Sequence, residues 1–192
     1  QYKEEYETKF PEFAKRFTSN LLQQIKADSS PNVTQQKFGE EVGSTDIILE
    51  SSQIDQIKSK LENADVLNDR VLRILNSNFV KMTFPVFNAL FDASTEYFHD
   101  NKDSKLREDI VDGHIIAIDL SEPMDRIVDK DEDLDYLDDY KLMNPYILKL
   151  ARDKIAKGGE EVLKQFENGF KDARVGQYLD TKLKQNPTAI TD

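Results

Sequence analysis

The chain contains no cysteine. That absence excludes disulfide bonds, thiolate zinc sites and cysteine nucleophiles, although it does not fix the compartment in which the protein works. Glycine and proline are also scarce, with 7 and 6 residues among 192, and an all-β protein of this length needs more of them for its turns. No apolar run approaches the roughly 20 residues that a membrane-spanning helix requires. The chain is therefore expected to be helical, without a transmembrane segment.

Positively charged residues are in the minority, with 26 Lys and Arg against 37 Asp and Glu and a net charge of -11. An acidic surface repels the phosphates of nucleic acids and anionic lipids, so no nucleic-acid partner is expected. A protein partner with a basic surface is the natural electrostatic match. Solubility alone also accounts for such a charge.

Apolar side chains recur at helical spacing in three parts of the chain. The first stripe comprises Phe10, Phe13, Phe17, Leu21 and Ile25. It predicts a helix from about Tyr2 to Ala27. A second stripe, from Ile54 to Phe79, predicts one long helix or two helices joined near Asn63. A third, from Ile147 to Phe170, predicts a last helix that the pair Gly158 and Gly159 can break in two.

Turn and capping residues suggest where these helices begin and end. Pro85 and Pro145 suit the first turn of new helices, the latter with Asn144 as its cap. A helix is expected to begin near Ser51 or Ser52, where Ser52 and Asp55 resemble a capping box. Another is expected after Asp103 or Ser104.

Two segments are expected outside the helices. Residues 29–45 are polar and include Gly39 and Gly43, which predicts a mobile loop. Residues 185–192 predict a frayed tail. The acidic run at 129–139 does not match a calcium loop, since Leu134 stands where Gly is needed. That run is interpreted as a solvated acidic face.

The fold class that follows is all-α. We expect residues 1–192 to form a single helical domain, an elongated antiparallel bundle of about six helical segments. Ile115, Ile116 and Ile118 are β-branched, so a short strand or irregular segment near 114–118 is the alternative there. One aromatic-rich set is expected in the core, and its members are Phe10, Phe13, Phe17, Phe84, Phe87, Phe91, Tyr97 and Phe98. A groove between helices that holds an apolar ligand or a partner helix is the alternative.

The residues that bear on catalysis are few. Glu96 and His99 lie three residues apart, on one face of a helix. Di-iron helical bundles use two such pairs and two further carboxylates, but Val111 occupies the position three before His114. A metal-dependent enzyme built from this chain would use Glu96, His99, Asp109, Asp112 and His114. No serine-nucleophile elbow or phosphate-binding glycine loop occurs, so no catalytic residue and no cofactor is expected.

One stretch carries a family resemblance. Its residues are Tyr97, Phe98, Asp100, Lys102, Asp103, Asp109 and Gly113. They resemble the aromatic, Lys- and Asp-rich helix junction of YiiG-like bacterial envelope lipoproteins, which are helical proteins of unknown function. The resemblance covers residues 84–118, and 142–165 would follow as the C-terminal helices. It implies a location in the bacterial cell envelope, in the periplasm or on a membrane anchor, and supplies no catalytic residue.

The chain starts at Gln1, without an initiator Met. This start is interpreted as that of a trimmed chain or, as the alternative, of a mature chain that has lost a signal peptide. A lipid anchor on a Cys upstream of Gln1 is a further alternative. Three functions follow. The first is a non-enzymatic helical binding or structural protein of the cell envelope. The alternatives are an acidic inhibitor or immunity-type protein that covers a basic partner, and a metal-dependent helical-bundle enzyme.

Overall fold

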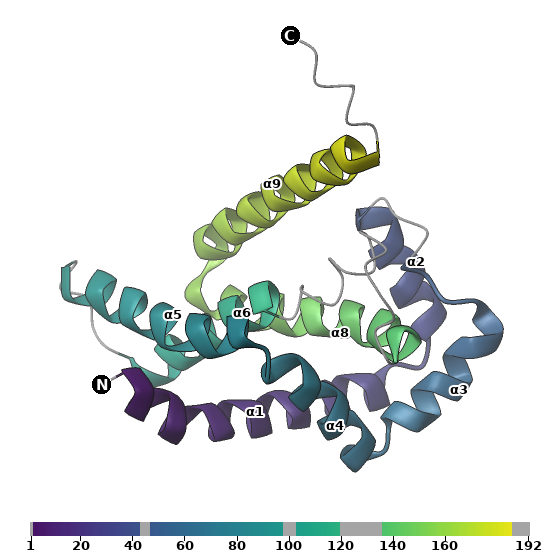
Figure 1. Ribbon diagram of the computed structural model, residues 1–192, viewed down its shortest axis with the longest axis horizontal. Coiled ribbons are helices and arrows are strands. Elements are labelled where there is room, and N and C mark those ends of the chain that lie inside the picture. Colours follow the sequence, from purple (N-terminus) through teal and green to yellow (C-terminus); the bar gives the residue numbers. More distant parts are fainter. Residues whose placement is uncertain (1, 43–46, 98–102, 120–135, 186–192) are drawn as a thin grey trace, which may run out of the picture.

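The computed structural model describes residues 2–42, 47–97, 103–119 and 136–185, which form helices and no strand. The helices are α1 (Tyr2–Ala27), α2 (Pro31–Val42), α3 (Ser51–Leu61), α4 (Ala64–Leu75), α5 (Asn78–Tyr97), α6 (Ser104–Asp119), α8 (Leu137–Ile155), the 3₁₀ turn η1 (Ala156–Gly158) and α9 (Glu160–Gln185) (Figure 1). The predicted all-α class is confirmed, with eight packed α-helices in the described residues against about six expected. None of the described helices combines the length and apolarity that crossing a bilayer requires.

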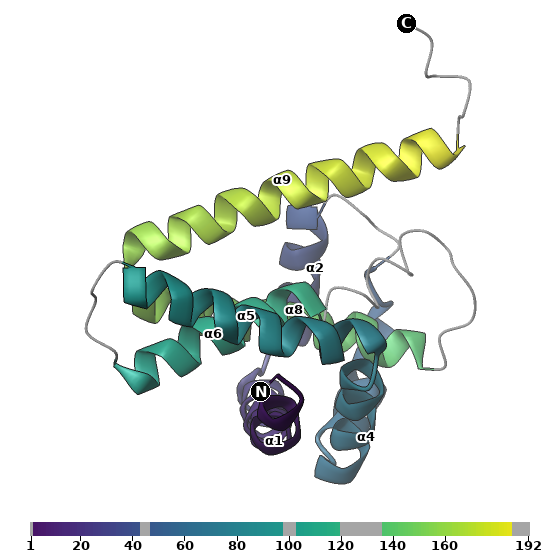
Figure 2. The same cartoon turned by 60° about the vertical axis from the view of Figure 1, so that its left-hand side comes forward.

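The core forms where α1, α5, α6 and α8 meet. Helix α6 packs on α8 and α5, and α1 contacts α4, α5 and α8. Figure 2 shows α1 and α4 on one side of this core and α9 on the other. The apolar stripe predicted for α1 is buried as expected, with Phe13, Leu21 and Ile25 wholly inaccessible. Pro11 lies inside this helix.

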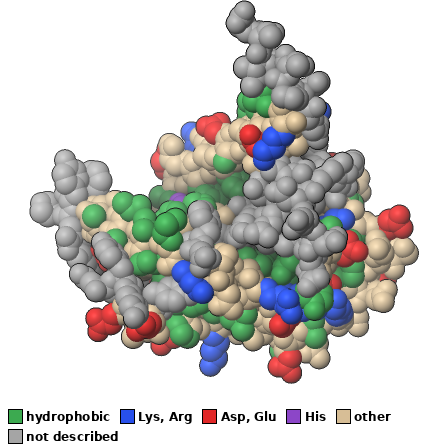
Figure 3. Space-filling view, viewed as in Figure 1, with side chains coloured by type: hydrophobic (Ala, Val, Ile, Leu, Met, Phe, Trp, Pro, Cys, Tyr) green, Lys and Arg blue, Asp and Glu red, His purple; other side chains and the backbone are tan. Residues whose placement is uncertain are grey.

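The described aromatic side chains predicted for the core, on α1 and α5, are buried or partly buried, whereas the side chains of Tyr97 and Phe98 lie outside the described part of the chain. Phe10, Phe13, Phe17 and Phe84 are buried, and the rings of Phe10 and Phe84 meet edge to face with centroids 5.6 Å apart. Phe87 and Phe91 are partly buried against the same core. Figure 3 shows hydrophobic side chains that remain on the surface over α5.

The alternative of a strand at 114–118 is wrong. Helix α6 continues through Asp119, and Ile115 and Ile116 are completely buried. Packing of a helical face on the core outweighs the weak strand preference of β-branched residues.

The mobile loop expected at 29–45 is wrong for residues 31–42, which form α2. Asp28 accepts hydrogen bonds from the backbone N–H of Ser30 at 2.7 Å and from the hydroxyl of Thr34 at 2.6 Å, which fixes the start of this helix. The side chain of Gln35 is buried. It accepts from Leu49 N and donates to the carbonyl of Lys141, which ties α2 to its neighbours.

The predicted helix starts at the two prolines are wrong. Helix α5 begins at Asn78 and α8 at Leu137, so Pro85 and Pro145 lie inside them. Asn144 is likewise a buried residue within α8, where it caps nothing. A proline in a helix interior destabilises the fold by about 3 kcal/mol. Each large apolar side chain that the preceding turns bury stabilises it by roughly 2 kcal/mol, which offsets this cost.

Other predicted boundaries are confirmed. Asn63 separates α3 from α4, and its side chain accepts from Asp65 N at 2.9 Å. Asp103 caps α6 by accepting from Lys105 N at 2.9 Å. Gly159, with φ of 103°, stands between η1 and α9.

Two further expectations are corrected. Helix α3 begins at Ser51 as predicted, but its cap is Glu50 without a side-chain bond, so the capping box proposed at Ser52 is wrong. Asp139, placed on a solvated acidic face, is buried and accepts from Arg70 and Lys60, both at 2.7 Å. The rest of the acidic run up to 135 and the tail at 186–192 lie outside the described residues.

Candidate functional site

The structure brings together two of the five candidate metal ligands. Asp109 and Asp112 lie one turn apart on α6, and both are buried. His114 points elsewhere: its Nδ1 lies 2.8 Å from the carbonyl oxygen of Ile110. Glu96 is on α5, and its side chain lies outside the described part of the chain, as does His99. Within the described part, no three His, Asp or Glu side chains are placed to hold a metal ion.

The ring of His114 contacts aromatic rings of two other helices. Its ring lies 6.3 Å from that of Phe87 and 5.7 Å from that of Phe166, measured between centroids. The imidazole thus packs between α5 and α9. It has no contact with the carboxylates of Asp109 and Asp112 in the described structure.

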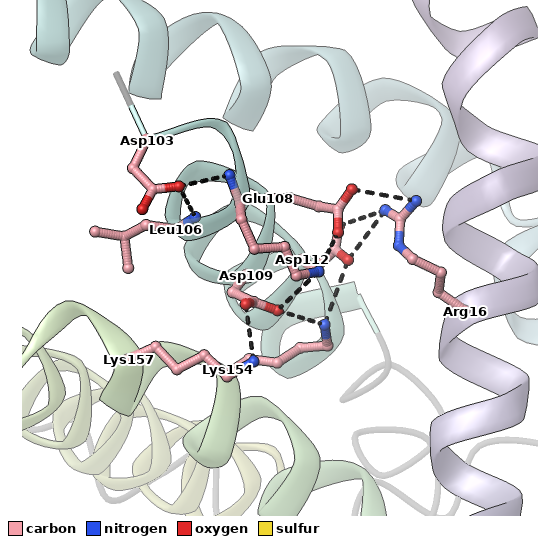
Figure 4. Close-up of polar contacts among 9 residues, drawn as sticks. Arg16, Asp103, Leu106, Glu108, Asp109, Asp112, Lys154 and Lys157 are labelled. Atoms are coloured by element: carbon pink, nitrogen blue, oxygen red, sulfur yellow. Dashed lines mark hydrogen bonds and ion pairs between the residues drawn. The ribbon is translucent and has the colours of Figure 1, made fainter. Parts of the chain in front are cut away.

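The oxygens of Asp109 are taken by two lysines from the end of α8 and from η1. Lys154 Nζ donates to Oδ1 at 3.1 Å and Lys157 Nζ donates to Oδ2 at 2.8 Å (Figure 4). Burial alone raises the pKa of Asp109, but the hydrogen bonds from Lys157 and Lys154 outweigh it and hold the pKa below its ordinary value. Asp109 is therefore a stable anion at neutral pH.

Asp112 pairs with a different helix. Arg16, on α1, donates from Nη2 to Oδ2 of Asp112 at 3.1 Å, and Lys154 Nζ lies 3.5 Å from the same oxygen. Burial raises the pKa of Asp112, and the charges of Arg16 and Lys154 only partly compensate. One buried ammonium, that of Lys154, thus lies between two carboxylates whose pKa values shift in opposite directions.

Glu108 extends the network to the surface. It accepts from Lys105 Nζ at 2.6 Å, and its Oε2 lies 3.5 Å from Nη1 of Arg16. Burial raises the pKa of Glu108, whereas the hydrogen bond from Lys105 and the charge of Arg16 lower it below its ordinary value. The helical spacing of Lys105, Glu108, Asp109 and Asp112 places them on one face of α6.

A pocket of about 480 Å³ opens beside this network, between α1, α6 and the end of α8. Its basic lining residues are Lys15, Arg16, Lys105, Lys154 and Lys157. Asp109 and Asp153 are its acidic ones. Five cationic side chains thus line one hollow of a chain whose net charge is -11.

Several donors in the pocket lack a protein acceptor. Lys15, Ser19 and Asn20 line the pocket without a side-chain hydrogen bond or ion pair to any described residue. The lining therefore offers donors to a ligand that brings its own acceptors.

Sequence reasoning found two members of this network and missed the basic ones. Asp109 and Asp112 were singled out as metal ligands, but Arg16, Lys154 and Lys157 were not, because 96 residues separate Arg16 from Asp112 and 45 separate Asp109 from Lys154. The sequence signal that could have indicated this network was the helical spacing of the charged residues on α6, which places them on one face of the helix.

Comparison with protein families, with curated proteins and with solved structures found no match. A functional proposal therefore depends on the fold and the pocket alone.

Proposed function

We propose that this chain is a non-enzymatic helical binding protein, and that its pocket receives a small anion bearing carboxylate or phosphate groups. The observation that carries this proposal is the convergence of five cationic side chains from α1, α6, α8 and η1 on one hollow of an acidic chain. Basic side chains dispersed for solubility alone have no reason to gather in this way.

The charge balance favours an anionic ligand. Glu108, Asp109, Asp112 and Asp153 set four negative charges against the five positive ones, which leaves an excess of one. The carboxylates hold Lys154, Lys157 and Arg16 in place, so these groups lose little freedom when a ligand binds. Lys15 has no carboxylate partner among the described residues and can close on the ligand.

The energetic cost of burying this network also favours a role in ligand binding. Lys154 and Asp109 have side chains 6% and 3% exposed, and removing two charges from water costs several kcal/mol per ion. An apolar cluster of the same volume would stabilise the fold about as well. The buried charges are then better explained by a ligand that uses them than by stability.

The size of the pocket restricts the ligand to a small molecule. A volume of about 480 Å³ lies within the range of sites for small ligands and cofactors. The donors of Lys15, Ser19 and Asn20 call for several acceptor oxygens on one molecule. Phosphate esters and polycarboxylates share this chemistry.

Titration of the ¹⁵N-labelled protein with inorganic phosphate and, separately, with citrate at low ionic strength tests the proposal. We expect amide shifts confined to Lys15, Ser19, Lys105 and the end of α8, with a dissociation constant on the order of 1 mM or below. The probe that binds more tightly distinguishes the phosphate class from the carboxylate class.

Two variants make the titration specific. Lys15→Ala and Lys105→Ala remove exposed cations of the pocket, and each is expected to weaken binding about tenfold. Lys26→Ala is the matched control, because Lys26 is an exposed lysine of the same helix as Lys15 and does not line the pocket. Equal weakening by all three variants, or no amide shift with either probe, would contradict the proposal.

A location in the bacterial cell envelope is the second part of the proposal. Its support is the resemblance of residues 84–118 to YiiG-like lipoproteins. The residues encoded upstream of Gln1 test it: a signal peptide that ends in a lipidated Cys is expected, and a gene that starts directly at this segment would contradict it.

A further inference from the structure

A second pocket lies between α6 and the first half of α9, and we name it the α9 pocket. Its apolar lining comes from Ile118 on α6 and from Val162, Phe166 and Phe170 on α9. Figure 3 shows hydrophobic side chains in the hollow beneath α9. The volume is about 560 Å³, which lies within the range of sites for small ligands.

The wall that α9 contributes is aromatic and otherwise flat. The rings of Phe166 and Phe170 stack with centroids 5.9 Å apart. Gly169 and Ala173, which also line the pocket, place no large side chain beside them. A Cβ at Gly169 would meet nothing within 4 Å. A planar ring system suits such a lining, because aromatic rings favour stacked and edge-to-face contacts with one another.

His114 supplies the pocket with one hydrogen-bond acceptor. Its Nδ1 lies 2.8 Å from the carbonyl oxygen of Ile110. A carbonyl oxygen can only accept, so Nδ1 carries the proton, and Nε2 of the neutral ring is an acceptor. Among the described residues, none donates to Nε2. A ligand that brings its own N–H or O–H donor can therefore use this nitrogen.

The other polar groups of the lining disfavour a charged ligand. The side-chain amide of Gln165 donates to Oε1 of Glu161 at 2.8 Å, so these two groups satisfy each other. No Lys or Arg stands among the lining residues, and the carboxylate of Glu161 repels an anion. A cation is also disfavoured, because most of the lining is apolar and desolvating a charge there is costly.

We infer that the α9 pocket binds a small uncharged aromatic molecule that donates one hydrogen bond to Nε2 of His114. Phenols and aryl amines have this chemistry. The lining rings supply stacking, and the single acceptor supplies orientation, as is usual for sites in which a few polar groups stand among apolar ones. The site is independent of the anion pocket, which is lined by α1, α6, α8 and η1.

Two matched probes test the class of ligand. 2-Naphthol carries a hydroxyl donor, and 2-methoxynaphthalene has the same ring system without one. The chain contains no tryptophan, so naphthyl fluorescence can be excited beyond the absorption of the protein. At about pH 8, where imidazole is neutral, we expect 2-naphthol to bind with a dissociation constant on the order of 0.1 mM. The methoxy compound should bind about fivefold more weakly.

His114→Phe tests the acceptor. The variant keeps an aromatic ring between Phe87 and Phe166 but has no ring nitrogen, so the preference for 2-naphthol should disappear while 2-methoxynaphthalene still binds. In the unmodified chain, the ¹⁵N resonance of His114 Nε2 should shift with 2-naphthol and not with 2-methoxynaphthalene. Equal affinity of the unmodified chain for the two probes would overturn the role of His114.

Gly169→Leu tests the location by filling the α9 pocket. The added side chain has room at this position, and leucine is a better helix former than glycine, so the variant should fold. It should bind 2-naphthol at least about tenfold more weakly. Gly176→Leu is the matched control, because Gly176 lies in the same helix, has the same open space and does not line the pocket.

Circular dichroism of both glycine variants verifies that the helix content is unchanged. Amide shifts caused by 2-naphthol should be confined to residues around His114 and Phe166. Equal weakening by Gly169→Leu and Gly176→Leu, or no change of naphthyl emission with the unmodified chain, would overturn the inference. The proposed anion binding would be unaffected by that result, since its probes are phosphate and citrate.

Discussion

The ammonium group of Lys154 lies 3.1 Å from Oδ1 of Asp109, and their side chains are 6% and 3% exposed. This pair joins α8 to α6 beneath the pocket. Breaking a buried pair by removing one partner leaves an uncompensated charge in the interior, which costs far more than the pair itself contributes. The stability of the fold should therefore depend strongly on the charge of Asp109.

Asp109→Asn is expected to lower the free energy of unfolding by about 3 kcal/mol at neutral pH, because Lys154 and Lys157 lose their charged acceptor. Urea denaturation followed by circular dichroism measures this. Asp153→Asn is the matched control: Asp153 pairs with Lys149, but its side chain is 53% exposed. Its effect should stay within about 0.5 kcal/mol. Similar losses for both variants would contradict a special role for the buried pair.

The cost of Asp109→Asn should depend on pH. The pKa of Asp109 is lowered in the folded protein, so its carboxylate contributes stability above its unfolded pKa of about 3.9. That contribution is lost as the pH falls through the lowered, folded-state pKa. The difference between the unmodified chain and the variant should shrink as the pH falls below about 4. A difference that stays constant down to the acid transition would contradict the assigned shift.

Asp112→Asn should show the opposite pH dependence. Burial raises the folded-state pKa of Asp112, so folding favours the protonated form, and stability is lost as the pH rises through that raised pKa. The amide of the variant does not ionise, so its folded state does not lose stability in this way. The free energy of unfolding of the variant should therefore rise relative to that of the unmodified chain as the pH rises from about 4 to about 7. Carbon-detected NMR titration of the two carboxyl groups gives the pKa values directly. A pKa of Asp112 below that of Asp109 would contradict the prediction.

Features set by neighbouring residues were predictable from the sequence. The stripe from Phe10 to Ile25, the helix junction near Asn63 and the cap at Asp103 each depend on residues within one or two turns. The all-α class follows from such local patterns. The arrangement around the pocket does not, because it depends on which face of α1 meets which face of α6.

The errors in the prediction also have physical causes. Pro85 and Pro145 were expected at helix starts, but Val80 and Tyr140, which precede them, are buried in the core. The burial of those turns extends each helix past its proline. Helix α2 has little apolar periodicity, and it depends on two hydrogen bonds to distant parts of the chain: Asp28 accepts from the hydroxyl of Tyr146, and Gln35 donates to the carbonyl of Lys141. Neither the burial of the turns before each proline nor the long-range hydrogen bonds of α2 can be predicted from the spacing of nearby residues.

Tyr146→Phe tests the polar anchor at the start of α2. The hydroxyl of Tyr146 donates to Oδ2 of Asp28 at 2.9 Å, which joins α8 to the α1–α2 corner. Losing this bond should cost about 1 kcal/mol in the free energy of unfolding. Asp28→Ala should cost more, about 2 kcal/mol, because Ser30 N and Thr34 also lose their acceptor. Equal stability of Tyr146→Phe and the unmodified chain would show that the bond contributes nothing.

Gly113 allows α6 to approach α8 closely, and its replacement should separate them. A Cβ at this position would lie 2.6 Å from Cγ1 of Ile155 and 3.1 Å from the backbone oxygen of Ala151. Ile155 is completely buried, so its side chain has little room to move. Gly113→Ala should therefore lower the free energy of unfolding by about 2 kcal/mol, although alanine is the better helix former.

Gly169→Ala is the control for this substitution. Gly169 lies inside α9, and a Cβ there would meet nothing within 4 Å. The change should raise the free energy of unfolding by about 0.5 to 1 kcal/mol, since alanine loses less backbone entropy on forming a helix. Thermal and urea denaturation of both variants measure the two effects side by side. If Gly113→Ala proved as stabilising as Gly169→Ala, the close packing of α6 on α8 would be wrong, and with it the position of Lys154 between Asp109 and Asp112.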